Sequence, residues 1–328
     1  MQWLRYCKLY VSTSSENKVA LDLSDYRIKF KITQAVMGKP CTAEITVYNV
    51  SKDVVDSIGV EANQAVAGKR LKVILDAGYE DSHATVFSGD LWWKTTGRES
   101  QTDTYMRLVA AIGDRANRYA VVNGTLPKGA SQKDIASFIA KTYAAYGIKL
   151  DSENLPKNLI KTNLPRGRVL YSLSRDAIRQ FASNNRLDFG YTNLEGVVFV
   201  PSDATYDQSE PVVVINSATG MINRPRLTTG GVQVQCLLNP RIDVGTLVKI
   251  DNASIIHQSL VTDFTAQSIT ENTAATNFLV DADGVYRVLQ RTHEGDTRGQ
   301  SWYTNLNCIA LTGNQPIVPS VYNTLQNL

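Results

Sequence analysis

The side chains that most often carry chemistry are few in this chain and form no catalytic or metal-binding pattern. Its three histidines are His83, His257 and His293, and none belongs to an HExxH or HxH segment. His83 lies in the polar stretch EDSHAT, which predicts a loop, and His257 lies between apolar neighbours in SIIHQSL, which predicts a strand. We therefore predict no catalytic role for the histidines.

Motifs for nucleotide binding, hydrolysis and metal binding are missing as well. The sequence has no GxSxG, GxGxxG or GxxxxGK[ST] segment. The segment DADG at 281–284 resembles the start of an EF-hand calcium loop, but the twelfth position counted from Asp281 is Thr292 instead of glutamate. A hairpin turn is the favoured interpretation there. We expect no cofactor and no bound metal.

Paired carboxylates would serve a glycosidase, and cell-wall cleavage is the rival function that they would support. The candidates are Glu80, Asp81, Glu195 and Asp203. All four lie in turn-like contexts, where acidic residues are common for conformational reasons. These residues therefore give only a weak signal for an enzyme. We expect that the protein is not an enzyme.

The pair Trp92–Trp93 is a more distinctive feature. Neighbours on a strand point to opposite faces, so one indole is expected in the core and the other at the surface. An exposed tryptophan would suit a protein interface. The alternative is that both rings are buried between layers.

The four cysteines, Cys7, Cys41, Cys236 and Cys308, are scattered and lack CxxC spacing. They predict reduced, mostly buried thiols in a protein made in a cytoplasm, with a disulfide between distant cysteines as the alternative. The amino-terminal segment MQWLRYCKLYVS has no signal-peptide core, because charged residues interrupt it. No stretch approaches the roughly 20 apolar residues of a membrane span, so we expect no membrane insertion.

Length and charge narrow the class of protein further. A chain of 328 residues predicts two or three domains. The 34 basic and 31 acidic residues give a net charge of +3, too balanced to favour specific nucleic-acid binding. Arg166, Arg168, Arg175 and Arg179 cluster in sequence, and we interpret them as a solvated basic face.

The first block, residues 1–114, has the pattern of a β domain. Apolar and polar residues alternate in AEITVYNV (43–50) and again in TYMRLVAAIGD (104–114), as expected for half-buried strands. The run LKVILDAGY (71–79) is apolar at its centre and predicts a strand covered on both sides. Gly78 and Gly89 predict unusual dihedrals or close approach of neighbours.

The spacing of apolar residues changes to a helical period in residues 115–205, which predict a small α+β domain. Apolar residues at helical spacing follow Ser131, and Ser131 with Asp134 resembles a capping box. A second helix is expected from Ser174, as its N-cap, to about Asn184. The segments LDFGYT and GVVFVP then predict a hairpin.

Residues 206–312 return to β patterns. Residues alternate in GVQVQCLLNP (231–240), and residues 284–311 predict two strands joined by a polar loop. Residues 313–328 are polar with two prolines and predict a tail or docking arm. This tail and the polar segments 79–84 and 291–300 are the candidate interface segments, with plain solvated turns as the alternative. The expected fold is therefore mainly β, with two tube-like barrel or sandwich domains flanking a small helix-helix-hairpin domain.

Four phrases in this order resemble the baseplate hub proteins of contractile-tailed bacteriophages, the late-control-D-type tail hub family. They are AEITVYNVS, the AGY of LDAGYEDSHATVFSGDLWW, GMINRPRLTTGGVQVQCLLNPRIDVGTLVKID, and DGVYRVLQRTHEGDTRGQSWYTNLNC. They cover about 40–115 and 215–310, and Val50 replaces the usual leucine of the first phrase.

The resemblance implies a non-enzymatic hub in the virion tail baseplate, made in the bacterial host cytoplasm. It implies a homotrimeric ring, in which two tube-like β domains per subunit present pseudo-sixfold symmetry to a hexameric tail tube. The other end would hold a trimeric, membrane-piercing central spike used in host cell injection. Other baseplate proteins are further expected partners. A related hub occurs in type VI secretion spikes, so a phage-derived particle is a near variant.

Two other functions stay open from the sequence. A cell-wall-binding or peptidoglycan-degrading tail protein would use the helix-helix-hairpin domain to grip glycan, and a pair of carboxylates to cleave it. A tail tube or spike-tip protein is the third possibility, which a sixfold assembly would favour.

Overall fold

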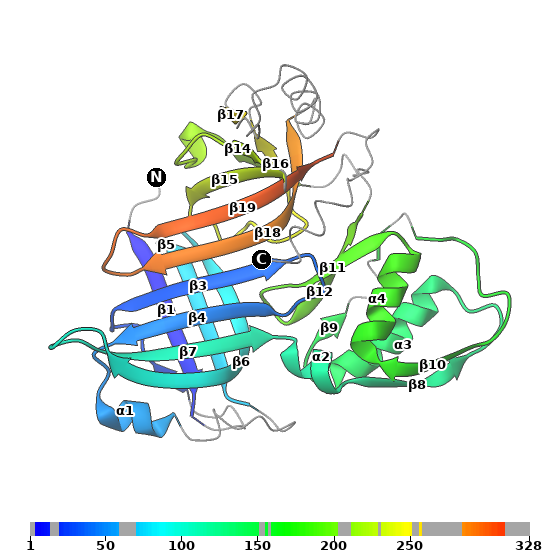
Figure 1. The fold of residues 1–328 in the computed structure, drawn as a ribbon, viewed down its shortest axis with the longest axis horizontal. Coiled ribbons are helices and arrows are strands. Elements are labelled where there is room, and N and C mark those ends of the chain that lie inside the picture. The colour runs from blue at the N-terminus through cyan, green and yellow to red at the C-terminus, as the bar shows by residue number, and fades with distance from the viewer. Residues whose placement is uncertain are drawn as a thin grey trace, which may run out of the picture.

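The protein is mainly β and is built around one large sheet. The structure, a computed structural model, describes residues 4–13, 20–58, 70–150, 155–156, 159–202, 211–228, 231–250, 256–257 and 284–311. Within these residues, one sheet has 14 strands, and two smaller sheets have two and three strands. Figure 1 shows the large sheet on one side of the molecule, with the short helix α1 (Lys52–Ser57) beneath it, and the helices α2 (Asp114–Tyr119), α3 (Gln132–Ala144) and α4 (Ser174–Asn184) on the other side.

Seven strands in the amino-terminal third form what we call the first β unit. They are β1 (Arg5–Ser12), β2 (Ala20–Asp22), β3 (Ile28–Ala35), β4 (Cys41–Tyr48), β5 (Lys72–Tyr79), β6 (Ser82–Arg98) and β7 (Thr104–Ile112), with helix α1 (Lys52–Ser57) after β4. The spatial order is β3-β4-β7-β6-β5-β1-β2, and every pairing is antiparallel. In Figure 1, β1 and β5 cross behind β3, β4 and β7, so the sheet curls over its own core.

Alternation of apolar and polar residues sets the buried face of these strands. Ala43, Ile45 and Val47 of β4 are buried, as are Met106 and the next alternate residues of β7, which confirms both predicted strands. The prediction that 71–79 is covered on both faces was wrong. The side chain of Ile74 on β5 is 37% exposed, because among the described residues no layer covers the outer face of the sheet there.

A helix-containing module follows the first β unit and extends from α2 to β12. Its elements are α2 (Asp114–Tyr119), β8 (Val121–Leu126), α3 (Gln132–Ala144), β9 (Lys149–Leu150), β10 (Arg168–Leu173), α4 (Ser174–Asn184), β11 (Leu187–Tyr191) and β12 (Gly196–Pro201). Strands β8 and β10 pair in one small sheet, and β11, β12 and β9 form the other. Both predicted helices and the hairpin are confirmed.

The amino-terminal ends of the two long helices differ. The Ser131 hydroxyl accepts from the Asp134 N–H, and the Asp134 carboxylate accepts from the Ser131 N–H, which completes the predicted capping box of α3. Ser174 is not the N-cap of α4, as the sequence predicted. Leu173 is the N-cap, and Ser174 is the buried first helical residue, whose side-chain oxygen lies 2.8 Å from that of Thr142.

The carboxy-terminal strands form a second β unit that continues the same large sheet. Its elements are β13 (Val212–Ile215), η2 (Ser217–Thr219), β14 (Arg226–Thr228), β15 (Gly231–Leu237), β16 (Leu247–Ile250), β17 (Ile256–His257), β18 (Val285–Asp296) and β19 (Trp302–Ala310). β15, β18 and β19 confirm the predicted strands. β18 pairs with β3 from Gln290 opposite Ala35 to Asp296 opposite Lys29, and so joins the two β units.

The apolar residues nevertheless divide into two main clusters. One contains the core of the first β unit and of the helix-containing module. The other lies inside the second β unit and includes Val232, Val234, Tyr286, Val288 and Cys308. The domain boundaries at residues 114, 205 and 312 stay a prediction, and residues 313–328 lie outside the described residues.

Candidate functional site

The three histidines lie apart in the structure. His83 is in β6, not in a loop as predicted, and its ring stacks on Tyr6 with centroids 3.8 Å apart. His257 lies in the predicted strand, β17. His293 on β18 is fully buried, with Nδ1 2.9 Å from the Thr304 hydroxyl. Burial, and then the nearby Arg291 cation, lower the pKa of His293 well below its ordinary value, so the ring is neutral at pH 7.

The candidate carboxylates do not gather into a pair. Glu80 and Asp81 occupy the turn between β5 and β6, whereas Glu195 lies between β11 and β12 and binds Lys72 at the opposite end of β5. At about 3.3 Å per residue, β5 keeps the two groups roughly 25 Å apart, against about 5–10 Å in glycosidases. Asp203 lies outside the described residues. The described part of the chain likewise holds no group of three His, Cys, Asp or Glu residues suited to a metal ion.

Glu195 instead belongs to an ion network where the module meets the first β unit. The Lys72 ammonium contacts the Glu195 carboxylate and lies 2.8 Å from Asp90, which also faces Arg115 at 3.9 Å. Burial lowers the pKa of Lys72, but the Asp90 and Glu195 carboxylates outweigh burial and raise the pKa above its ordinary value. The network therefore joins Lys72 and Asp90 of the first β unit to Glu195 and Arg115 of the module.

The turn that contains Glu195 joins all three parts of the chain, and we call residues Asn193, Leu194 and Glu195 the junction turn. The Asn193 carbonyl accepts from the Ser88 N–H of β6 at 3.0 Å. Its side-chain oxygen accepts from Arg291 of β18 at 2.5 Å. Just before the turn, the Gln34 amide of β3 donates to the Tyr191 carbonyl at 2.5 Å. These bonds fix the module against the large sheet.

The four cysteines are free, and three of them are buried, as the sequence predicted. Burial raises the pKa of Cys41 and Cys236 to about 12, and it raises the pKa of Cys308 as well. Burial and then the Asp76 carboxylate raise the pKa of the half-buried Cys7 to about 12. Such thiols stay protonated at neutral pH and are poor nucleophiles.

Neither tryptophan of the Trp92–Trp93 pair lies in the core, contrary to both alternatives that the sequence left open. Trp92 is 38% exposed and Trp93 is 56% exposed. The pairing of β6 with β7 shifts register between Leu91 and Trp93, and such a bulge interrupts strict alternation of faces. The Arg118 guanidinium covers the Trp92 ring at 5.1 Å.

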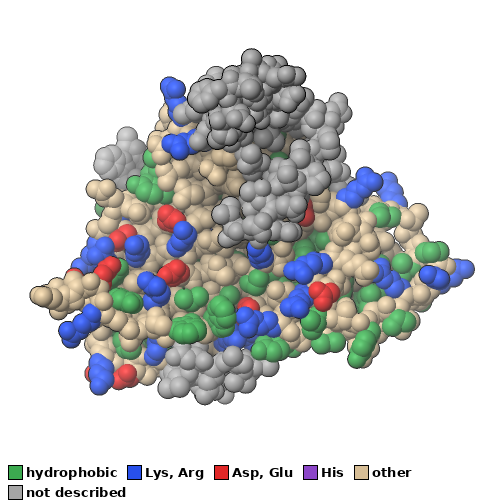
Figure 2. All heavy atoms as spheres, viewed as in Figure 1, with side chains coloured by type: hydrophobic (Ala, Val, Ile, Leu, Met, Phe, Trp, Pro, Cys, Tyr) green, Lys and Arg blue, Asp and Glu red, His purple; other side chains and the backbone are tan. Residues whose placement is uncertain are grey.

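The clustered arginines belong to the helix-containing module, where Arg168 lies in β10 and Arg175 and Arg179 lie in α4. Figure 2 shows Lys and Arg side chains on that side of the molecule and over the large sheet as well. Arg166 and Arg179 are exposed, whereas Arg168 and Arg175 are partly buried. Arg168 donates to Gln180 at 2.8 Å, and Arg175 and Arg179 lie 3.7 and 3.8 Å from Asp176. The expected solvated basic face is therefore present, with one carboxylate among its cations.

The candidate interface segments have different positions. Residues 79–84 form the tight end of the β5–β6 hairpin. Residues 291–296 are not an exposed loop, because they belong to β18 and because Arg291 and His293 are fully buried there. The loop that follows is held by Arg5, which donates to the Asp296 carbonyl at 2.9 Å and to the Gln300 carbonyl at 3.0 Å.

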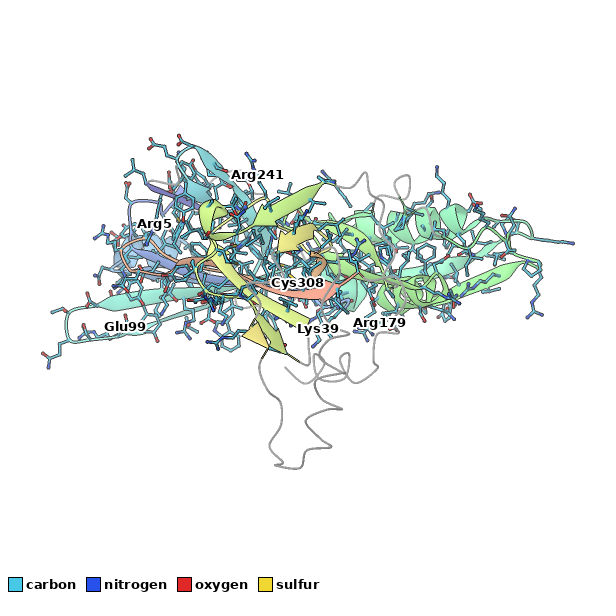
Figure 3. The ribbon with its side chains drawn as sticks, turned by 90° about the horizontal axis from the view of Figure 1, so that it is seen from above. Arg5, Lys39, Glu99, Arg179, Arg241 and Cys308 are labelled. Atoms are coloured by element: carbon cyan, nitrogen blue, oxygen red, sulfur yellow. The ribbon has the colours of Figure 1, made fainter. Side chains whose placement is uncertain are left out.

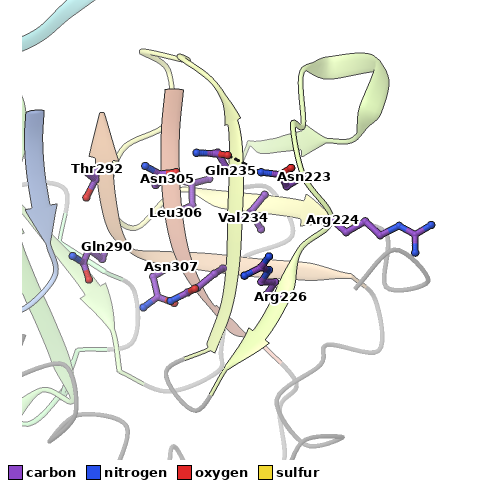
Figure 4. A pocket seen from close by; sticks show the side chains of 11 residues that line it. Asn223, Arg224, Arg226, Val234, Gln235, Gln290, Thr292, Asn305, Leu306 and Asn307 are labelled. Carbon is purple, nitrogen blue, oxygen red and sulfur yellow. Dashed lines mark hydrogen bonds between the residues drawn. The ribbon is translucent and has the colours of Figure 1, made fainter. Parts of the chain in front are cut away.

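The second β unit carries a polar groove of about 510 Å³ across β14, β15, β18 and β19 (Figure 4). Its sides are rows of paired side chains: Gln233, Asn307 and Gln290 form one row, and Gln235, Asn305 and Thr292 form the next. Arg224 and Arg226 add positive charge at one side, and none of the described residues that line the groove carries a carboxylate. Carboxamides donate and accept together, so this groove suits peptide groups of a protein partner.

The described surface carries a polar groove, a basic face and exposed aromatic residues, which are features of a protein that assembles with other proteins. The family model for the baseplate hub gp41 matches residues 9–283. The chain therefore belongs to the baseplate hub gp41 family and is a structural protein of the phage tail baseplate, which confirms the resemblance in its sequence.

Solved structures with the same fold come from other tail proteins. The 43 kDa tail protein of prophage MuSo2 from Shewanella oneidensis is 8% identical, with a TM-score of 0.54 over 94% of this chain and 98% of that chain. The tail protein from Neisseria meningitidis MC58 is 10% identical, with a TM-score of 0.51 over 94% and 97% of the two chains.

A chain of a PdpA–VgrG complex shares the fold as well. The Francisella PdpA–VgrG complex contains a chain that is 7% identical, with a TM-score of 0.53 over 95% of this chain and 59% of that chain. At these identities the likeness concerns the fold alone. None of the curated proteins matches the sequence.

Proposed function

We propose that the chain forms a homotrimeric ring in the baseplate, which adapts the sixfold tail tube to a threefold central spike. The observation that carries this proposal is the match of the baseplate hub gp41 family to most of the chain, residues 9–283. The partners are then the tail tube protein on one side of the ring, the spike protein on the other, and further baseplate proteins around it.

The division of the apolar core into two clusters supports this symmetry. One cluster contains the core of the first β unit together with that of the module, and the other lies in the second β unit. Three copies would present six β units around one axis, which suits a sixfold tube and keeps threefold symmetry for the spike. The junction turn holds both β units and the module in fixed positions, as a load-transmitting ring requires.

Binding, not catalysis, is the activity that we propose. The rival function, cleavage of the cell wall, needs two carboxylates within about 10 Å of each other. Glu195 is engaged by Lys72, and its separation from Glu80 along β5 disfavours that function for these residues. No helix among the described residues is long and apolar enough to cross a membrane.

Light scattering after gel filtration tests the proposal. We expect a particle of about 109 kDa, three times the chain mass of 36.2 kDa, with a threefold ring visible by electron microscopy. A monomer would be measured again with the spike protein present, since ring closure can require that partner. A stable dimer, or a sixfold particle, would contradict the proposal. Loss of turbidity of a cell-wall suspension would favour the rival enzyme.

A further inference from the structure

The outer face of the β8–β10 sheet is uncharged and contains exposed valine and tyrosine side chains although it faces solvent. The register places Val121 opposite Leu173, Asn123 opposite Tyr171 and Thr125 opposite Val169, all on this face. Tyr171 is 77% exposed, Val169 is 69% exposed and Val121 is 53% exposed. None of these six side chains carries a charge. We call these six residues the β8–β10 face.

The opposite side of the same sheet explains why this face points outward. Val122, Leu126 and Leu170 are buried, and a Cβ on Gly124 would lie 2.4 Å from the Phe138 ring of α3. This packing fixes the register, because a slip by one residue would exchange the two faces. Within the described residues, β8 and β10 pair only with each other, and an isolated two-stranded sheet gains stability from a further layer.

Charge is distributed unevenly between this module and the rest of the chain. Residues 115–205 contain 13 Lys and Arg against 7 Asp and Glu, a net charge of +6. The other residues contain 21 basic and 24 acidic side chains, a net charge of −3. Exposed Arg118, Lys128 and Arg166 are basic residues close in sequence to the two strands. The module is therefore electrostatically complementary to the rest of an identical chain.

We propose that the β8–β10 face is a subunit contact, and that its occupant is the part of a second copy of this chain that contains the two β units and is the more acidic part. An uncharged centre containing an exposed tyrosine, with charged residues around it, has the composition of a protein–protein interface. A contact between two different surfaces of identical chains is head-to-tail, and such contacts close into rings. This inference rests on the proposed ring and identifies one side of its subunit contact.

The same residues disfavour nucleic acid as the occupant of this face. Nucleic-acid sites are strongly charged and polar throughout, whereas this face is uncharged and exposes valine and tyrosine. An anionic lipid surface would be attracted by the basic residues, so it becomes an outcome of the test. In Figure 2, hydrophobic side chains gather along the lower rim, where Figure 1 places β6, α2 and the β8–β10 sheet.

The first experiment compares Tyr171→Asp and Val169→Asp with a matched control, Ile160→Asp. Ile160 is also apolar and 44% exposed, and it lies in the same module but outside this face and outside the junction turn. We expect both face variants to weaken subunit association at least about 100-fold by light scattering over a dilution series, because an aspartate would be buried unpaired. The control should assemble as the wild type does. Circular dichroism and the urea midpoint of each dissociated chain check that the variants fold.

The second experiment measures accessibility of the face directly. Tyr171→Cys is labelled with a thiol reagent in the assembled and in the diluted, dissociated protein, against a weak background because the native thiols have raised pKa values. We expect at least about tenfold protection in the assembly. Gln101→Cys, two residues from Glu99 at the end of the molecule opposite the module (Figure 3), should label equally in both states.

The outcomes separate this inference from the proposed function. A wild-type trimer whose Tyr171→Asp variant remains a trimer, with Tyr171→Cys unprotected, overturns the subunit contact and leaves the ring standing. A wild-type chain that stays monomeric even with the spike protein overturns both. Binding of the wild type to anionic phospholipid vesicles that Tyr171→Asp alone abolishes, with assembly unchanged, assigns the face to a membrane and overturns the inference.

Discussion

Arg291, at the centre of β18, donates a hydrogen bond of 2.5 Å to the side-chain oxygen of Asn193, which lies 98 residues earlier in the junction turn. The guanidinium is fully buried, and it also donates to the Ile242 carbonyl at 3.0 Å and lies 3.5 Å from Asp243. Burial lowers the pKa of Arg291, and the Asp243 carboxylate opposes this effect. A buried cation thus connects the second β unit to the helix-containing module.

Asn193→Ala should destabilise the protein by about 1–3 kcal/mol, because it removes an acceptor from a buried cation. The free energy of unfolding from urea titration measures the effect. Leu194→Ala is the neighbouring control, and at 63% exposure it should change stability by less than about 0.5 kcal/mol. Equal effects of the two substitutions would show that the Arg291 contact contributes little.

The free energy of unfolding should fall on mild acidification, because the buried ring of His293 resists protonation in the folded protein. Its folded-state pKa is lowered, so its contribution is present above the unfolded value of about 6.5 and is lost as pH falls toward the folded value. Each pH unit in that window costs up to about 1.4 kcal/mol. The urea midpoint of the wild type between pH 7.5 and pH 5 should therefore fall more steeply than that of His293→Asn. Parallel pH profiles would contradict the assignment.

Gly78, the glycine of the AGY segment, should not tolerate a side chain. Its φ is +152°, and a Cβ there would lie 2.4 Å from the Ser82 carbonyl oxygen and 2.7 Å from the His83 Cα. Trp302 also donates to the Gly78 carbonyl at 3.1 Å. Gly147→Ala is the control, since Gly147 has a φ of +81° but no neighbour within 4 Å. We expect Gly78→Ala to lose at least about 2 kcal/mol more than the control in thermal or urea unfolding.

The thiols should be nearly inert in the native protein. Their pKa values are raised, to about 12 for Cys7, Cys41 and Cys236, so the reactive thiolate is scarce at pH 7.5. A colorimetric thiol reagent should find four reactive groups after unfolding in guanidinium and fewer than one within the first minutes in buffer. Rapid reaction of one native thiol, with Cys7 the most exposed candidate, would contradict this prediction.

Local structure followed from the sequence wherever a short-range pattern determines it. Alternation in 104–112 predicted which face of β7 is buried, and Ser131 with Asp134 predicted the start of α3. The Ser174 cap failed because Leu173 already has the extended backbone of an N-cap and Ser174 is buried in the first turn. The prediction for the tryptophan pair was wrong because β6 has a bulge between Leu91 and Trp93. The bulge depends on how β6 pairs with β7, which the sequence of β6 alone does not specify.

The sequence by itself determined the mainly β character, the helices and hairpin of the module and, through four ordered phrases, the baseplate hub family. Only the tertiary structure decided that the four cysteines are unpaired, that β18 pairs with β3, that Arg291 binds Asn193, and that the β8–β10 sheet has an uncharged outer face with exposed valine and tyrosine. A period of two shows which residues of a strand share a face, but it does not identify the strand beside it. That choice depends on contacts between distant residues, which form only when the whole chain packs.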